Sequence, residues 1–133
     1  MSEEPLLLGI DIGTSKVAAA IVEPDGVCRE SRSMVHGADL ACAPGRAEQD
    51  PRVLLDAARQ VVRDLEPALR ERVEAVGVTG QMHGVVLVDR QGQPVGSLVT
   101  WQDRRCDAAF LERLHAQTGY MLHSGYGCLL YTS

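Results

Sequence analysis

The sequence predicts an α/β fold with a mixed sheet, in which three antiparallel meander strands precede a helix and further strands. Strand-like apolar segments and one amphipathic helix follow one another in the order strand, strand, strand, helix, strand. Two glycine-rich loops come directly after apolar strands, and open α/β sheets bind ligands at that edge. The 133 residues, 45% of them hydrophobic, are enough for one domain with a core.

The first three strands are joined by short turns. Residues 6–10 (LLLGI) form a continuous apolar run, which is typical of a strand buried on both faces. Residues 16–23 (KVAAAIVE) follow a glycine turn, and a PDG turn leads into residues 27–35 (VCRESRSMV). Short turns favour antiparallel pairing, so we expect a meander. A polar loop then occupies residues 36–49.

Residues 50–73 carry the strongest helix signal. Asp50 is a favourable N-cap, and Pro51 suits the first helical position because its missing N–H has no partner there. Pro67 is expected to end or kink the helix. One apolar stripe at helical spacing comprises Leu54, Ala58, Val61, Val62 and Leu65.

Strand-like segments follow this helix. Residues 73–80 (VEAVGVTG) predict another buried strand, and residues 85–89 (VVLVD) and 97–101 (SLVTW) flank an RQGQP turn. Residues 103–119 predict a final helix with apolar residues at helical spacing, which should end at Gly119.

Composition excludes several classes of function. The net charge of −5 argues against a general nucleic-acid binder, and no stretch approaches the ~18 apolar residues of a membrane helix. The opening MSEEP is no signal peptide, so a cytoplasmic location is expected and the four cysteines are expected to be free thiols. Lys16 is the only lysine beside twelve arginines, which suggests a specific role for it.

The stretch GIDIGTSK combines residue types that can hold phosphate. Gly13 lets the backbone approach a phosphate, and Thr14 and Ser15 offer hydroxyl and amide donors. Lys16 adds a point charge, and Asp11 could hold Mg²⁺ with several waters retained. A Walker loop is excluded because it would open a helix, whereas this loop joins two strands. A tight hairpin with an acid at its edge remains the alternative.

Two later stretches could bind a polyol. In GQMHG, Gln81 and His83 could hydrogen-bond hydroxyl groups while Met82 covers an apolar edge. Taken alone, His83 fits a structural histidine better than a ligand group. In TWQDRRC, Trp101 lies beside an amide, a carboxylate and arginines, a combination that suits sugar stacking and hydrogen bonding. The alternative is a core tryptophan before a helix capped by Asp103.

Taken together, these three stretches resemble the FGGY carbohydrate kinase family, which has the actin-like, ribonuclease-H-like ATPase fold. The family's G-I-D-x-G-T opening is matched by Gly9–Thr14, its EQDP by Glu48–Pro51, and its GQMHG is followed by W-x-D-x-R. The resemblance runs from about Leu6 to at least Gly127. Within the family the stretches look most like the sedoheptulokinase branch and next like the xylulokinase branch.

The resemblance implies a role for each matched residue. Asp11 would act in the Mg²⁺ and phosphate network, and Arg104 would brace the sugar site where relatives often have glycine. The ATP phosphates would be lined by Gly13, Thr14, Ser15 and Lys16. The ketose would be bound by Met82, His83, Trp101 and Asp103, with Gln81 shaping its loop.

Family members are several times longer than this chain, and their general-base aspartate and adenosine-binding half would lie beyond residue 133. We therefore expect residues 1–127 to be an incomplete amino-terminal kinase domain that is inactive alone. Residues 128–133 (CLLYTS) look like a non-native tail from adapter read-through.

Two other classes of function stay open. The chain could be a non-catalytic sugar-binding relative, or another actin-like ATPase that shares only the DIGT loop. The two polyol-type loops argue against the second, because filament and chaperone ATPases need no sugar pocket. The expected ligands are ATP, Mg²⁺ and a ketose, with no nucleic acid and no membrane.

Overall fold

A computed structural model of the chain describes residues 4–124, which form two compact units. The sheet unit comprises residues 4–37 and 52–80, and the loop unit comprises residues 38–51 and 81–124. The predicted tail at 128–133 lies outside the described residues. Among the residues described, no helix is both long and apolar enough to cross a membrane.

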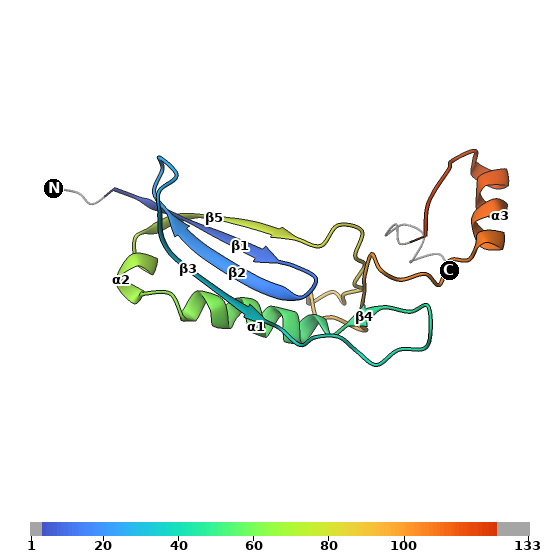
Figure 1. Cartoon of the computed structure of the whole chain (residues 1–133), viewed down its shortest axis with the longest axis horizontal. Coiled ribbons are helices and arrows are strands. Elements are labelled where there is room, and N and C mark those ends of the chain that lie inside the picture. Colours follow the sequence, from blue (N-terminus) through green and yellow to red (C-terminus); the bar gives the residue numbers. More distant parts are fainter. Residues whose placement is uncertain (1–3, 125–133) are drawn as a thin grey trace. The chain divides into compact units, whose positions relative to one another are not determined.

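The sheet unit contains a four-stranded mixed sheet in the order β3-β2-β1-β5 (Figure 1). Its strands are β1 (Leu6–Ile12), β2 (Lys16–Val22), β3 (Cys28–Val35) and β5 (Val73–Gly80). β2 pairs antiparallel with both β1 and β3, which confirms the predicted meander. β5 runs parallel to β1, so both strands end at the same edge of the sheet.

Helix α1 (Pro51–Arg63) covers one face of the sheet and α2 (Pro67–Arg70) follows it (Figure 1). α1 begins at the predicted proline and ends before the second one, because a proline inside the helix would clash with the preceding turn. The core lies between α1 and the sheet, and it buries Leu6, Leu8, Val17, Ala19, Ile21, Ala57, Ala58, Val61 and Leu65.

The predictions that β1 is buried on both faces and that β5 is a buried strand are wrong. β1 alternates, because Leu6 and Leu8 are buried in the core whereas Leu7 on the other face is 38% exposed. β5 is exposed beyond its first residue, with Val76 56% and Val78 66% exposed. The described helices bury only one face of β1 and β2, and β5 is one of the two edge strands.

The loop unit is built on a short two-stranded sheet, β4 (Glu48–Gln49) paired antiparallel with β6 (Leu98–Val99). Residues 85–89 do not form the predicted strand and make only isolated bridges, Val85 with Val99 and Val88 with Pro94. Asp89 explains the early end of pairing, because its carboxylate accepts the backbone N–H groups of residues 91 and 93 and closes a turn.

The final helix, α3 (Ala108–Thr118), ends at Gly119 as predicted, with that glycine in the left-handed conformation. It begins five residues later than the predicted residue 103. Asp107 is its N-cap, since its side chain accepts from the Phe110 N–H at 2.8 Å. The alternative of Asp103 as the cap is therefore wrong. Of the cysteines, Cys28, Cys42 and Cys106 are free thiols, as expected.

Candidate functional site

The β1–β2 loop is a tight turn that closes on itself. The Gly13 N–H donates to the Lys16 carbonyl oxygen at 3.0 Å. A Cβ added to Gly13 would lie 3.0 Å from that same oxygen, closer than a side chain tolerates without a backbone shift. Glycine is therefore required here by space inside the loop, which keeps the turn narrow.

His36, which the sequence reasoning missed, supports this loop. It follows β3 directly and its side chain is buried, with Nε2 3.3 Å from the Gly13 carbonyl oxygen. A carbonyl oxygen only accepts, so Nε2 carries the proton in this contact. The His36 backbone N–H donates to the Ser15 carbonyl oxygen at 3.4 Å. The only sequence signal for His36 was its position directly after the third predicted strand. The strand register, in which Val35 pairs with Lys16, places it opposite the hairpin.

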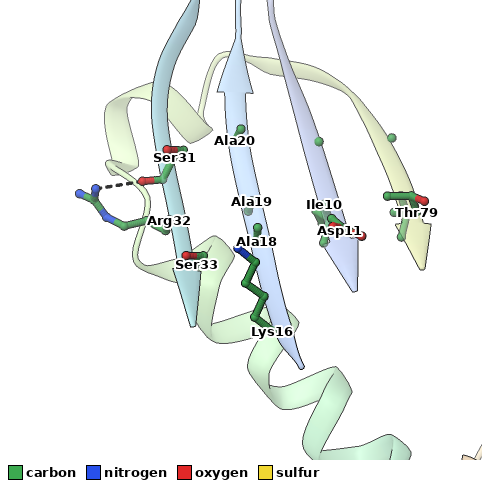
Figure 2. A pocket seen from close by; sticks show the side chains of 13 residues that line it. Ile10, Asp11, Lys16, Ala18, Ala19, Ala20, Ser31, Arg32, Ser33 and Thr79 are labelled. Carbon is green, nitrogen blue, oxygen red and sulfur yellow. Dashed lines mark hydrogen bonds between the residues drawn. The ribbon is translucent and has the colours of Figure 1, made fainter. Parts of the chain in front are cut away.

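Asp11 and Lys16 lie on the open face of the sheet, beside a shallow pocket of about 700 Å³ (Figure 2). The strand register places Asp11 next to Ala18 on one side and Thr79 on the other. The floor consists of small residues, namely Gly9, Ala18, Ala20, Ser31, Ser33 and Gly77. Among residues 4–124, no ion pair joins Asp11 to Lys16 and both side chains are exposed.

This arrangement fits a hydrated Mg²⁺ rather than a fully protein-bound metal. Within the described part of the chain, no group of three or more acidic, histidine or cysteine side chains could hold a metal ion. Mg²⁺ needs only one or two carboxylates and keeps its waters, and the exposed Asp11 offers one such oxygen ligand.

The loop unit brings the two polyol-type loops together. Val85 and Val99 exchange two backbone hydrogen bonds, each 2.9 Å long, in an antiparallel bridge. Antiparallel register then places Gly84 beside Thr100, and a Cβ on Gly84 would lie 3.2 Å from Leu98 Cδ1. The GQMHG loop thus ends where the TWQDRRC segment begins.

The side chains that could touch a ligand here are exposed. Met82 is 77% exposed and Trp101 is 43% exposed, so neither is a core residue. His83 is also exposed, and its φ of 59° makes it the only non-glycine residue with positive φ in residues 4–124. Left-handed conformations are uncommon outside glycine and gather at functional sites.

Asp103, in contrast, is completely buried and is held by the protein itself. Its carboxylate accepts from the Ala47 N–H at 2.8 Å and from the Arg105 N–H at 2.9 Å. The Arg105 guanidinium adds a bidentate contact, in which Nε donates to Oδ1 and Nη2 donates to Oδ2, each at 2.8 Å. Burial opposes the charged form, but these hydrogen bonds outweigh it and lower the pKa of Asp103 to about 2.

Arg105 links Asp103 to Glu48 on β4. The Arg105 Nη2 lies 2.6 Å from Glu48 Oε1, and Ser97 Oγ donates to the other Glu48 oxygen. The hydrogen bonds from Ser97 and Arg105 lower the pKa of Glu48. The hydrogen bond to Asp103 raises the pKa of Arg105 further above its usual range. The three groups therefore form a charged network beneath the Trp101 segment.

Gln49, the neighbour of Glu48 on β4, holds the other loop. Its side chain is 1% exposed, and its Oε1 accepts from Gln81 Nε2 at 2.7 Å. Gln49 Nε2 donates to Asp39 Oδ1 at 2.8 Å. Gln81 is thereby fixed at the start of the GQMHG loop.

Arg104 lies across the backbone of the tryptophan segment. Its Nη1 is 3.1 Å from the Trp101 carbonyl oxygen and 3.3 Å from that of Ser124. The Arg104 N–H also donates to the Gly45 carbonyl oxygen at 2.7 Å. Among the residues singled out from the sequence, Asp11 to Lys16 belong to the sheet unit and Gln81 to Arg104 belong to the loop unit.

Comparisons with known proteins agree with these features. A family model described as the FGGY family of carbohydrate kinases, N-terminal domain, matches residues 6–131. Sedoheptulokinase of Mus musculus is 32% identical, over 96% of this chain and 32% of the relative. A xylulose kinase of Staphylococcus epidermidis is 33% identical, over 75% of this chain and 21% of the relative.

A solved structure of a xyloylose kinase from Brucella ovis superposes with a TM-score of 0.76 at 28% identity, covering 91% of this chain and 27% of that one. This likeness confirms the actin-like ATPase fold that the sequence motifs implied. The chain spans a third or less of the length of the relatives it matches. It belongs to the FGGY family of carbohydrate kinases, as a match to the N-terminal domain of that family.

Proposed function

We propose that the chain supplies the amino-terminal domain of an ATP-dependent kinase that phosphorylates a ketose, with sedoheptulose as the first substrate to test. The Val85–Val99 bridge carries this proposal, because it brings the GQMHG loop beside the Trp101 segment. The 32% identity to a sedoheptulokinase over nearly the whole chain supports the choice of sugar. Xylulose is the alternative, supported by the similar xylulose kinase.

In the proposed enzyme the sheet unit receives the phosphates of ATP. Gly13 would let the backbone approach a phosphate, Thr14 and Ser15 would contribute their hydroxyl groups, and Lys16 supplies a positive charge on the same loop. Asp11 would hold a hydrated Mg²⁺, and a bound Mg²⁺ neutralises phosphate charge during transfer. The use of ATP also favours the cytoplasm as the location.

The loop unit receives the ketose. The exposed Trp101 indole offers a flat apolar face for sugar C–H groups, and Met82 offers a second apolar surface. The exposed His83, with its left-handed backbone, would hydrogen-bond a sugar hydroxyl. Arg104 braces this surface through the Trp101 carbonyl group.

Catalysis would need parts that residues 1–133 do not supply. The general base that deprotonates the accepting hydroxyl and the adenosine-binding half would come from a longer protein. Phosphoryl transfer depends on positioning and charge neutralisation from both sides of the substrate, so the 133-residue chain alone is expected to be inactive.

The test is ADP release, measured by a coupled assay on the complete kinase that contains this domain. We expect turnover with sedoheptulose above that with xylulose, ribulose or glycerol, and none from the 133-residue chain alone. Faster turnover with xylulose than with sedoheptulose would identify xylulose as the substrate. No turnover on any of the four acceptors would contradict the kinase proposal and favour a non-catalytic sugar-binding relative.

A further inference from the structure

We propose that Glu48 and Gln49, the two residues of β4, are positioning residues that set the two sugar-binding loops relative to each other. Neither side chain needs to touch the sugar, because each acts through one intermediary, Arg105 or Gln81. This inference rests on the proposed function and adds to it the residues that determine how well the sugar fits.

The Glu48 branch controls the Trp101 segment. Glu48 fixes the Arg105 guanidinium, which in turn grips Asp103 through both carboxylate oxygens. Asp103 has no exposed surface, and its carboxylate is held by the Ala47 N–H and by Arg105. It thereby fixes the chain two residues after Trp101, whose indole would face the sugar.

The Gln49 branch controls the GQMHG loop. Gln49 is buried and uses both ends of its amide, accepting from Gln81 and donating to Asp39. Gln81 precedes Met82 and His83, the exposed residues proposed to contact the sugar. The backbone of β4 itself pairs with Leu98 and Val99, which carry the chain into the Trp101 segment.

The geometry of the Glu48 branch depends on arginine and not only on positive charge. One guanidinium reaches two carboxylates, with three contacts between 2.6 and 2.8 Å. Lysine is a point charge that cannot reproduce this planar fork.

The kinetic experiment compares single variants of the complete kinase. Glu48→Gln, Gln49→Met and Arg105→Lys should each raise the sugar KM about tenfold, because a loop displaced by about 1 Å loses its alignment with the substrate. The ATP KM should stay within about twofold of the parent value, since the substituted residues belong to the loop unit and the phosphate loop belongs to the sheet unit. Arg90→Met is the matched control, an exposed arginine in the turn of the same unit, and should change neither KM.

Equal changes in both KM values, or no change in either, would overturn the positioning role. A purely structural role would lower the amount of active enzyme and hence kcat, leaving both KM values unchanged. Arg105→Lys keeps the positive charge, so its KM values still test the positioning role if a variant that changes the charge does not fold.

A second measurement needs no enzyme activity. Trp101 is the only tryptophan, so acrylamide quenching of the fluorescence of the 133-residue chain reports on its segment alone. Arg105→Lys and Glu48→Gln should each raise the quenching constant by about twofold relative to Arg90→Met, since a released indole meets solvent on more sides. Unchanged quenching in both variants would contradict the Glu48 branch. If the kinase assay shows no activity with any sugar, the proposed function fails, whereas the quenching result still decides the positioning.

Discussion

At His83 the backbone is held in a conformation that histidine rarely adopts. The φ of 59° lies in the left-handed region, where a Cβ crowds the following carbonyl group. The next residue, Gly84, does not have a positive φ. The left-handed conformation is therefore adopted by the histidine and not by the neighbouring glycine, which would adopt it at lower cost. Strain of this kind persists when the side chain serves a function at that position.

This conformation predicts a difference between two ways of removing the imidazole. His83→Gly should be more stable than His83→Ala by about 1 kcal/mol, because glycine adopts positive φ without a Cβ clash. Urea unfolding of the 133-residue chain measures the difference. An alanine variant as stable as the glycine variant would show that the backbone at residue 83 is not strained in solution.

Asp103 shows how a residue type can be recognised in a sequence while its role is not. The sequence identified a carboxylate next to a tryptophan and arginines, and those residues do lie in one network. Whether a carboxylate points to a ligand or inward depends on partners such as Ala47 and Glu48, which are more than fifty residues away along the chain. No local pattern could reveal them.

The Asp103 network predicts acid sensitivity. Because its pKa is lowered to about 2 in the folded chain, the carboxylate stabilises the fold fully above its unfolded pKa near 4. This stabilisation, about 2 kcal/mol, should be lost as the pH falls from about 5 to 2. Urea unfolding at a series of pH values measures the loss.

Two variants isolate the contribution of Asp103. Asp103→Asn should be less stable than the parent at pH 6 and should lose less stability on acidification. Asp56→Asn removes an exposed carboxylate on α1 and should keep the parent's pH dependence. Identical pH profiles for the Asp103 variant and the parent would show that this carboxylate is not held charged by Arg105.

At the scale of elements, the meander and the first helix were predictable and the burial of the strands was not. The meander follows from the short turns, and the bounds of the helix follow from the positions of its prolines. β5 has the same apolar composition as a buried strand, yet Val76 and Val78 are exposed. An apolar run indicates that a strand can be buried, but the element that packs on it is determined by the tertiary structure.

The exposed side of β5 lines an apolar groove of about 440 Å³ with residues from β1 and α1, including Ile10, Leu55 and Val78. We therefore expect the 133-residue chain to bind the apolar dye ANS and to be poorly soluble. Val78→Thr should reduce ANS fluorescence by about half because it interrupts this surface. Val27→Thr, at an exposed valine in a turn, is the matched control. Monodisperse parent protein that does not bind ANS would contradict this expectation.

The role of β4 could not be predicted because the strand is too short to give a sequence pattern. It has only two residues, too few for any periodic pattern, and yet its side chains reach both polyol-type loops. The resemblance to the kinase family singled out the EQDP stretch, but only the structure connects Glu48 with Arg105 and Gln49 with Gln81.

At the scale of the whole molecule, the family could be predicted from the three short stretches, and the match to its N-terminal domain confirms it. The two units divide the proposed labour, since the sheet unit carries Asp11 to Lys16 and the loop unit carries Gln81 to Arg104. The choice between sugars lies in exposed side chains such as Met82, His83 and Trp101, whose chemistry suits several polyols.

The central claim is that the loop unit binds the sugar while the sheet unit binds ATP. The most direct measurement is the ratio of sugar KM to ATP KM for His83→Ala and His83→Gly in the complete kinase. Both variants should raise the sugar KM about tenfold or more with little change in the ATP KM. The reason is that they remove the hydrogen bond from the imidazole to a sugar hydroxyl and no contact to ATP. An equal rise in both KM values would contradict the assignment of this loop to the sugar.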